Sequence, residues 1–333
     1  MTWEELKPMF RPENAHMGVM KVDEERCTGC GLCIWNCPFR AWEMGDNRIP
    51  RQKQQYACFS CFNCMVACPV DAISIVDIYH VDDGFWRTDP HPLPIKTPQE
   101  PFDAQGRLDK WTTVEEVILQ RRSVRNYKDE PVPESLIRRV LEAGRFAPSA
   151  GNCQPWKFIV VTNKALIKEM DEAIFNILST LYNAYISDEM VKGLVSVYES
   201  NPIPGAWDPR VVLGGYATIA RRDTPPLLNS PVVILIAGDD RAASGSMLNI
   251  GICGQNMCLA AQSLGLGSCW VGFTHVLNMV PSIMEKLGLK EPWRICNSIV
   301  LGYPRFKQQG IVAREFRPIT WFREGSAAPE IEE

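Results

Sequence analysis

Two cysteine runs with identical spacing constrain the fold of this chain more than any other feature. The first reads Cys27-x-x-Cys30-x-x-Cys33-x-x-x-Cys37-Pro38, and each of its cysteines has a counterpart 31 positions later, from Cys58 to Cys68. This spacing holds paired 4Fe-4S clusters: three closely spaced thiolates bind one cluster, while the fourth, followed by proline, binds the other. The runs therefore predict a unit that carries electrons one at a time.

The exchange of the fourth cysteine decides which ligands share a cluster. One cluster is predicted to bind Cys27, Cys30, Cys33 and Cys68. The other is predicted to bind Cys58, Cys61, Cys64 and Cys37. Residues 18–80, which contain both runs, resemble the bacterial-type 2x(4Fe-4S) ferredoxins.

Disulfides and zinc are the alternatives for these cysteines. Disulfides need an oxidising compartment, and the first residues, Met-Thr-Trp-Glu-Glu-Leu-Lys, lack the basic and apolar regions of a secretion signal. Zinc sites close with two pairs of ligands, so the third cysteine of each run would have no role. Iron-sulfur clusters remain the favoured interpretation, and they predict a reducing cytoplasm and anaerobic chemistry.

Composition narrows the choice of partners. The 333 residues exceed one typical domain, and 46% apolar with 22% charged residues is ordinary for a globular protein. A net charge of -4 argues against nucleic acid, which needs a basic face. Apolar stretches such as residues 232–237 are far shorter than the roughly 18 residues of a membrane span. We therefore expect neither nucleic acid nor a membrane as a partner.

A proline-rich segment predicts a boundary between two domains. Five prolines fall within residues 90–101, and so many prolines exclude a helix or a central strand. We assign residues 18–80 to the iron-sulfur unit, 81–111 to a semi-rigid linker and 112–325 to a second domain. The stiffness of the linker would keep the clusters near a fixed neighbour.

The second domain predicts an α+β fold. A capping box at Thr113 and Glu116 begins a helix that ends near Arg121, with Val114, Val117 and Ile118 on its buried face. A second helix follows, with Pro133 in its first turn and Gly144 as its stop. Further helices are expected at 165–186 and 250–264, and strands at 158–161, 232–237 and 296–301. No G-x-G-x-x-G follows a strand, which argues against a Rossmann domain.

Three separated motifs suit a flat, phosphorylated cofactor. Arg121-Arg-Ser-Val-Arg125 ends a helix with cations for a phosphate and an anionic ring edge. Asn152 and Gln154 place amide groups on a loop, where they can donate to and accept from a heterocycle. The third motif is the glycine-rich stretch 254–272, and Leu301-Gly-Tyr-Pro304 follows it in the sequence.

These motifs resemble the FMN-dependent nitroreductase superfamily over residues 112–318. The resemblance implies a central mixed sheet flanked by helices, a homodimer, and FMN held at the subunit interface by both chains. Arg122 is expected to face solvent, and Arg314 competes with Arg305 and Lys307 for the phosphate. The residues implied to bind FMN are Arg121, Ser123, Arg125, Asn152, Gln154, Val271, Gly272, Arg305 and Lys307, with a backbone N–H of the Val271-Gly272 segment near flavin N5.

Two further features are weaker. Residues 187–230 are rich in proline, glycine and aromatic residues, and we interpret them as a substrate lid, with a surface excursion as the alternative. His275 follows the 254–272 motif and could donate a proton, although a structural histidine is the commoner case.

The combined prediction is an electron relay that ends in two-electron chemistry. Reduced ferredoxin, or NAD(P)H instead, would supply electrons that pass singly through the clusters to FMN, which would reduce a nitroaromatic, quinone or enone. One alternative runs the relay backwards, with FMN oxidising a substrate. Another is a non-catalytic electron-transfer adaptor to a larger oxidoreductase. Cluster and flavin potentials would separate the two directions of electron flow.

Overall fold

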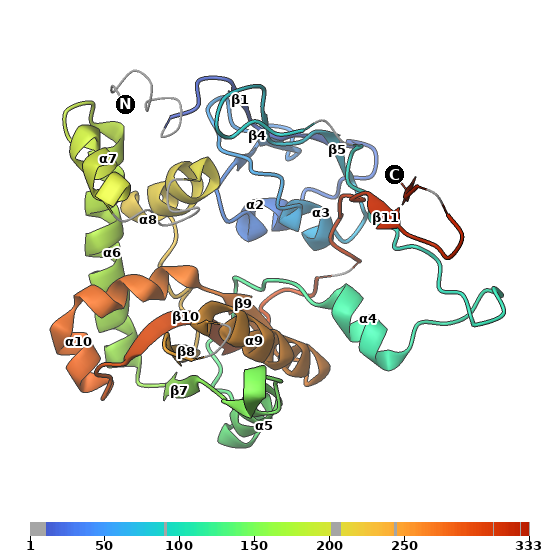
Figure 1. Ribbon diagram of the computed structural model, residues 1–333. Helices are drawn as coiled ribbons and strands as arrows, with labels where there is room; N and C mark the ends of the chain where they lie inside the picture. The colour runs from blue at the N-terminus through green and yellow to red at the C-terminus, as the bar shows by residue number, and fades with distance from the viewer. Residues whose placement is uncertain are drawn as a thin grey trace.

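The computed structural model describes residues 11–89, 92–200, 208–242, 245–308, 310–326 and 328–332, with the backbone alone at 197–199. An N-terminal unit of short elements lies above a larger body built on a sheet, and the long helix α6 (Lys164–Ile186) rises from the lower body towards the upper one (Figure 1). Within these ranges no helix is both long and apolar enough to cross a membrane.

The N-terminal unit repeats itself as its sequence does. Helix α2 (Leu32–Asn36) begins after Gly31 and helix α3 (Asn63–Ala67) after Phe62, and both preceding residues are left-handed, with φ of 72° and 57°. Each helix ends at the fourth cysteine of its run, Cys37 or Cys68, in nearly the same extended conformation. Three antiparallel pairs surround the helices: β1 (Ala15–His16) with β6 (His80–Val81), β2 (Val19–Val22) with β5 (Ile73–Asp77), and β3 (Trp42–Met44) with β4 (Pro50–Gln52).

The hydrophobic core of this unit draws on both ends of the chain. Trp42 and Ile73 are 3% and 4% exposed, and Val312 and Ala313, at 8% and 2%, belong to the same cluster. The predicted linker is tied to this assembly as well, because Ile95 pairs with Arg314 and Lys96 forms an ion pair with Asp71. The predicted linker residues Pro90 and His91 lie outside the described residues.

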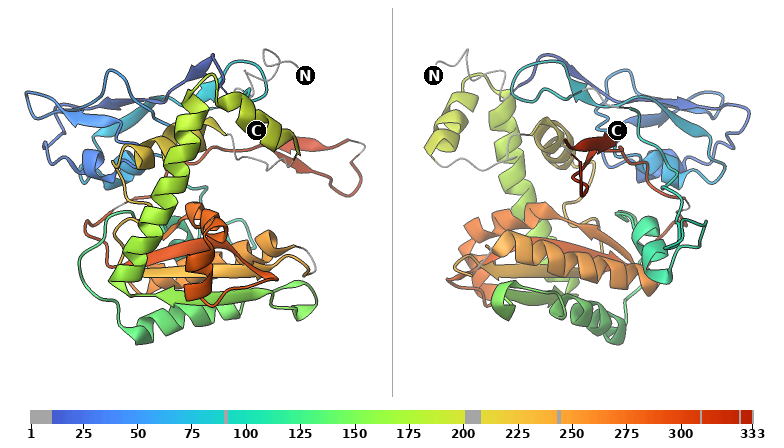
Figure 2. Two further views of the ribbon diagram at one scale, coloured as in Figure 1. Left: turned by 90° about the vertical axis from the view of Figure 1, so that its left-hand side faces the viewer. Right: turned by 45° about the vertical axis from the view of Figure 1, so that its right-hand side comes forward.

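The lower body is a four-stranded sheet between two layers of helix (Figure 2). The strands run β7 (Trp156–Val161), β8 (Val232–Asp239), β10 (Trp293–Gly302) and β9 (Gly267–Trp270), all antiparallel. A mixed sheet was predicted. Its parallel part is limited to an isolated bridge at the edge of the sheet, between Ser123 and Ser268.

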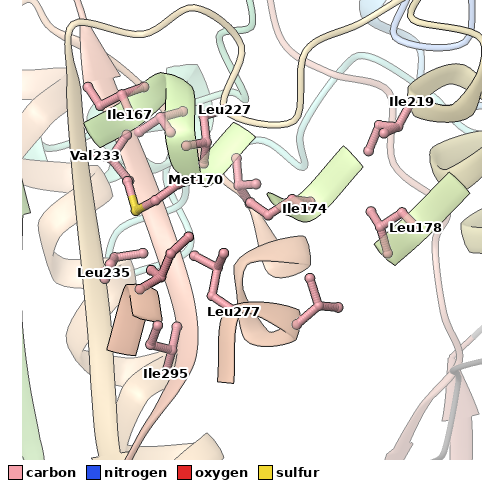
Figure 3. Packing of buried hydrophobic residues seen from close by; sticks show 14 of the residues in the cluster. Ile167, Met170, Ile174, Leu178, Ile219, Leu227, Val233, Leu235, Leu277 and Ile295 are labelled. Atoms are coloured by element: carbon pink, nitrogen blue, oxygen red, sulfur yellow. The ribbon is translucent and has the colours of Figure 1, made fainter. Parts of the chain in front are cut away.

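Successive side chains of β8 point to opposite faces of the sheet, so this strand contributes to both hydrophobic layers. Val233 and Leu235 face α6, where Met170 and Ile174 are fully buried (Figure 3). Ile234 faces the opposite side, against α5 (Glu134–Arg145) and α9 (Ser246–Ser263). The remaining helical elements are α4 (Thr113–Gln120), a 3₁₀ turn (Ala150–Asn152), α7 (Val191–Ser200), a π-helix (Arg210–Tyr216), α8 (Ala217–Ala220), a 3₁₀ helix (Gly272–Met279) and α10 (Pro281–Lys286). A short hairpin of β11 (Ile319–Trp321) and β12 (Glu330–Glu332) follows.

Several local predictions need correction. The capping box is formed by Thr112 and Glu115, one residue earlier than predicted, because these two side chains exchange hydrogen bonds with each other's backbone N–H. The face of α4 predicted to be buried is open, with Val114 66% exposed. Gly144 does not stop α5 but lies inside it, where a Cβ would come within 2.8 Å of Met257 on α9.

Candidate redox site

The structure brings together four cysteines from both runs around one small cavity. The residues that line it include Cys27, Cys30, Cys33 and Cys68. This is the set predicted for one cluster, and the cavity walls are otherwise mostly apolar. Burial raises the pKa of the Cys33 thiol to about 12. A thiolate in such surroundings needs a cation beside it, so the site suits a metal cluster.

The four cysteines of the second predicted set also lie near one another, and Cys61 among them lies near Arg125 of the lower body. Burial raises the pKa of the Cys58 thiol to about 12, with smaller contributions from the charges of Cys61 and Cys37. Burial also raises the pKa of Cys64, and Cys61, Cys58 and Cys37 add to the rise. Cys37 therefore lies with three cysteines of the other run, as the predicted exchange requires.

The two fourth cysteines have matching surroundings. The Cys37 Sγ accepts a hydrogen bond from the Ala41 N–H at 3.3 Å, and the Cys68 Sγ accepts one from the Ala72 N–H at 3.2 Å. Hydrogen bonds to ligand sulfurs are one of the means by which proteins set cluster potentials.

A second cavity lies where the two bodies meet, and its volume is about 270 Å³. Arg125, Val271 and Gly272 line it from the lower body, and all three belong to the predicted FMN residues. Pro38 and Phe39, which follow the fourth cysteine of the first run, line it from the N-terminal unit. The predicted FMN residues therefore share one cavity wall with the two residues that directly follow Cys37, a predicted cluster ligand.

Arg125 lines this cavity and also lies near Cys61 of the second cysteine set. Burial raises the pKa of the Cys61 thiol, and the positive charge of Arg125 opposes that rise. The guanidinium also donates to the Ser123 carbonyl at 3.4 Å. A cation placed beside a predicted cluster ligand and on the wall of the cavity would favour extra negative charge at both places.

The sheet edge holds the Arg125 segment in place. The Val124 N–H donates to the Ser268 carbonyl at 2.9 Å, and the buried Tyr127 hydroxyl donates to the Val124 carbonyl at 2.6 Å. A Cβ on Gly267 would lie 2.8 Å from the Val124 side chain, so only glycine permits this close approach.

Two arginines beside this segment differ in exposure. Arg121 ends α4 and is half-buried. Arg122 was expected to face solvent, but it is only 8% exposed and donates to the Gly310 and Gln120 carbonyls. Burial lowers its pKa, and the charge of Arg121 adds to that effect.

The remaining predicted residues do not line this cavity. Asn152 and Gln154 are exposed on the loop before β7, both with positive φ. Lys307 is exposed, and Arg305 lines a separate cavity of about 970 Å³. The exposed His275 has its Nδ1 2.7 Å from the Gly272 carbonyl. The Val271 N–H donates to the Ser298 carbonyl, so Gly272 is the better candidate for a backbone donor near flavin N5.

Part of the predicted lid covers the cavity. Arg210, Thr218 and Pro225 belong to its wall, and so do several of their neighbours. The same segment packs against the N-terminal unit, because a Cβ on Gly214 would lie 2.7 Å from Phe39 and 2.8 Å from Phe59. Residues 201–207 of the predicted lid lie outside the described part of the chain.

Phe39 and Arg210 line the cavity but were not predicted from the sequence. The position of Phe39, two residues after a ligand cysteine, was the available signal for it. Nothing local distinguishes Arg210, whose side chain is paired with Asp208 at 2.5–3.0 Å.

Comparisons with known proteins divide the chain in the same way. Residues 118–303 match the profile of the nitroreductase family, and residues 20–43 match that of the 4Fe-4S binding domain. These two matches confirm the predicted fusion of an iron-sulfur domain with a nitroreductase domain.

Individual relatives cover parts of the chain. A Methanothermobacter thermautotrophicus protein provisionally assigned as an NADH dehydrogenase/NAD(P)H nitroreductase is 30% identical over 200 residues, which are 60% of this chain and 81% of that protein. Nitrobenzene nitroreductase of Ectopseudomonas oleovorans is 26% identical over 207 residues, 57% and 86% of the two chains. A nitroreductase with bound FMN from Desulfitobacterium hafniense is 24% identical, with a TM-score of 0.46 over 61% of this chain and 95% of that one.

Proposed function

Because the chain belongs to the nitroreductase family and carries a 4Fe-4S binding domain, we propose that it is an iron-sulfur flavoprotein oxidoreductase that receives electrons singly and delivers them in pairs. The electrons would pass through two 4Fe-4S clusters to FMN and then to an electron-poor conjugated substrate of the nitroaromatic, quinone or enone type. When bound, the clusters exchange one electron at a time, and FMN can exchange either one or two.

One observation carries this proposal: the cavity of about 270 Å³ is lined from both bodies. Phe39 lies two residues after Cys37, a predicted ligand of the second cluster, and it shares the cavity wall with Arg125 and Gly272. A relay needs its donor and acceptor close together, and this cavity joins predicted FMN residues to the residues that directly follow a predicted cluster ligand.

The residues of the chain divide the work at this site. Arg125 would stabilise negative charge on the reduced ring, and the Gly272 N–H would donate to the ring edge. Phe39 and Val271 would exclude water from the ring, while Pro225 and its neighbours on the lid would limit access to substrates of flat shape.

We also propose a homodimer in which the partner completes the cofactor site. A volume of about 270 Å³ lies just below the range of ordinary ligand pockets. Asn152 and Gln154 are exposed in this chain, where they would be free to reach the cofactor of the partner. Arg121 and Ser123 are the candidates for the phosphate within one chain, and Arg305 and Lys307 remain weaker ones because neither lines this cavity.

The donor can be tested by anaerobic stopped-flow. Reduced ferredoxin, NADH and NADPH are each mixed with the oxidised holoenzyme, and flavin bleaching is followed. We expect reduced ferredoxin to bleach the flavin rapidly, and the rate to fall at least 100-fold in Cys58→Ala. Cys296→Ala, which removes a partly exposed cysteine outside both runs and outside the predicted FMN residues, is the matched control and should keep the wild-type rate.

Two results would redirect the proposal. Rapid NADH bleaching that survives replacement of Cys27 and Cys58 would show that the clusters are incidental to turnover. Cluster potentials well above that of the flavin would favour substrate oxidation, with the clusters as the electron outlet.

A further inference from the structure

We propose that His16, His80 and Asp82 bind one divalent transition-metal ion, preferentially Zn²⁺, at a site separate from the cysteines. His16 and His80 are directly opposite each other in the antiparallel pair β1–β6, at the edge of the N-terminal unit farthest from the lower body (Figure 1). Asp82 follows His80 by two residues, so the alternation of a strand places it on the same face.

The ligand atoms converge. The Nε2 of His16 lies 2.9 Å from one Asp82 carboxylate oxygen, and the Nε2 of His80 lies 3.5 Å from the other. The two rings stack with centroids 4.5 Å apart and planes within 10°. One ligand atom from each residue lies within 4.8 Å of the other two, close enough to share an ion.

The hydrogen bond of His80 fixes its tautomer. Its Nδ1 lies 2.9 Å from the Ile78 carbonyl oxygen, which can only accept, so Nδ1 carries the hydrogen. In the neutral ring Nε2 then presents a lone pair to the Asp82 carboxylate, which has lone pairs of its own. Two acceptors face each other here, and a cation between them would bind to both.

The chemistry of the set selects the kind of ion. Two imidazoles and a carboxylate suit Zn²⁺ and its first-row neighbours, with water in the fourth position. A ligating histidine commonly donates its other ring N–H to a backbone carbonyl, as His80 does to Ile78. No lysine or arginine in the described ranges pairs with Asp82, so its charge is left to the two histidines.

A bound ion would tether the start of the described chain to the cluster unit. The β1–β6 pair spans two residues on each strand, which is little backbone pairing on its own. Ligands from both strands would cross-link it without a disulfide.

Zinc content and coordination test the site. The holoprotein is equilibrated with chelator-buffered micromolar Zn²⁺, zinc per chain is measured by mass spectrometry, and zinc X-ray absorption reports the ligands. We expect about one zinc per chain with N/O ligands at about 2.0–2.1 Å, distinct from sulfur at about 2.3 Å. Affinity should fall at least tenfold in His16→Asn and Asp82→Asn.

Asp83→Asn provides the matched control. Asp83 is adjacent to Asp82 but accepts a hydrogen bond from Asn14, so this variant should keep its zinc. Unchanged iron content and flavin absorbance will show that each variant is folded. Sulfur-coordinated zinc alone, no zinc in the wild type, or equal zinc affinity in all three variants would each overturn the proposal.

Discussion

Asp171 is a carboxylate whose burial works against its charge. It lies on α6, and its Oδ1 accepts a hydrogen bond from the Leu227 N–H at 2.7 Å. Burial raises the pKa of Asp171 to about 6, the Leu227 hydrogen bond opposes the rise, and the charge of Glu172 adds to it. A carboxyl group with a raised pKa in the folded state stabilises the fold at low pH, and this contribution is lost as the pH rises through about 6.

We expect the ionisation of Asp171 to lower the free energy of unfolding as the pH rises from 5.0 to 7.5. The pKa of Asp171 implies a loss of about 1 kcal/mol over that interval, allowing for its partial exposure. Asp171→Asn keeps the acceptor for Leu227 but removes the charge, so it should lose correspondingly less.

Apparent melting temperatures at one scan rate will measure the difference, because cluster loss makes unfolding irreversible. Asp171 lines the cavity of about 970 Å³, and so does Asp129, an exposed carboxylate paired with Lys164. The melting temperature of Asp129→Asn should follow that of the wild type at each pH. The same pH dependence in wild type and Asp171→Asn would contradict the assignment.

The π-helix is the element that joins the lid to the N-terminal unit. Gly214 lies within it, and a Cβ there would approach both Phe39 and Phe59 to less than 3 Å. Gly214→Ala should therefore cost about 1–3 kcal/mol, because neither ring can retreat without moving the other. Gly193→Ala in α7 is the control, since no atom lies within 4 Å of its added Cβ.

Thermal unfolding and stopped-flow will test this contact together. We expect the apparent melting temperature of Gly214→Ala to fall by about 2–6 °C. Electron entry into the flavin should slow with it, because Phe39 lines the cavity. Gly193→Ala should be neutral or slightly stabilising. Equal melting temperatures and equal rates of flavin reduction in the two variants would mean that the packing at Gly214 contributes neither to stability nor to electron entry.

Elements with strong local patterns were predictable from the sequence. The apolar periodicity of α6 and the continuous apolar run of β8 led to nearly correct bounds. Strand β9 was missed because four residues with serine and cysteine carry little pattern, and its place depends on pairing with β10. The exposure of α4 could not be foreseen either, because an apolar face looks the same in sequence whether its cover is the same chain or another.

The candidate site shows the same division. Spacing alone predicted the cysteine sets, since cluster geometry dictates it. Arg125 and Gly272 came from the family resemblance. Phe39 and Arg210 entered only with the structure, because the docking of one body on the other brings them to the cavity.

At the scale of the whole molecule, α4 presents an apolar face with nothing over it in the described part of the chain. Val114 and Ile118 lie four residues apart on one side of the helix and are 66% and 49% exposed. Exposed apolar faces of this kind mark interfaces, and the homodimer proposed above would cover this one.

We expect Val114→Glu/Ile118→Glu to convert the proposed dimer, of twice 37.6 kDa, into monomers and to lower flavin occupancy. Light scattering after size exclusion will measure the mass. Phe85→Glu, at an exposed aromatic residue elsewhere, should leave the mass unchanged. A double variant that remains dimeric with full flavin would place the interface on another face.

The shared core of the N-terminal unit has a consequence for how the protein is made. Chains leave the ribosome from their N-terminal end, and early domains generally fold first. Here Val312 and Ala313 pack with Trp42 and Ile73, which are synthesised more than 200 residues earlier. The core around the cysteine-bearing segment therefore cannot be completed until residues 312 and 313 have left the ribosome. We therefore expect iron-sulfur assembly in its final packed form to follow the synthesis of residues 312 and 313, although the cysteine ligands are translated more than 200 residues earlier.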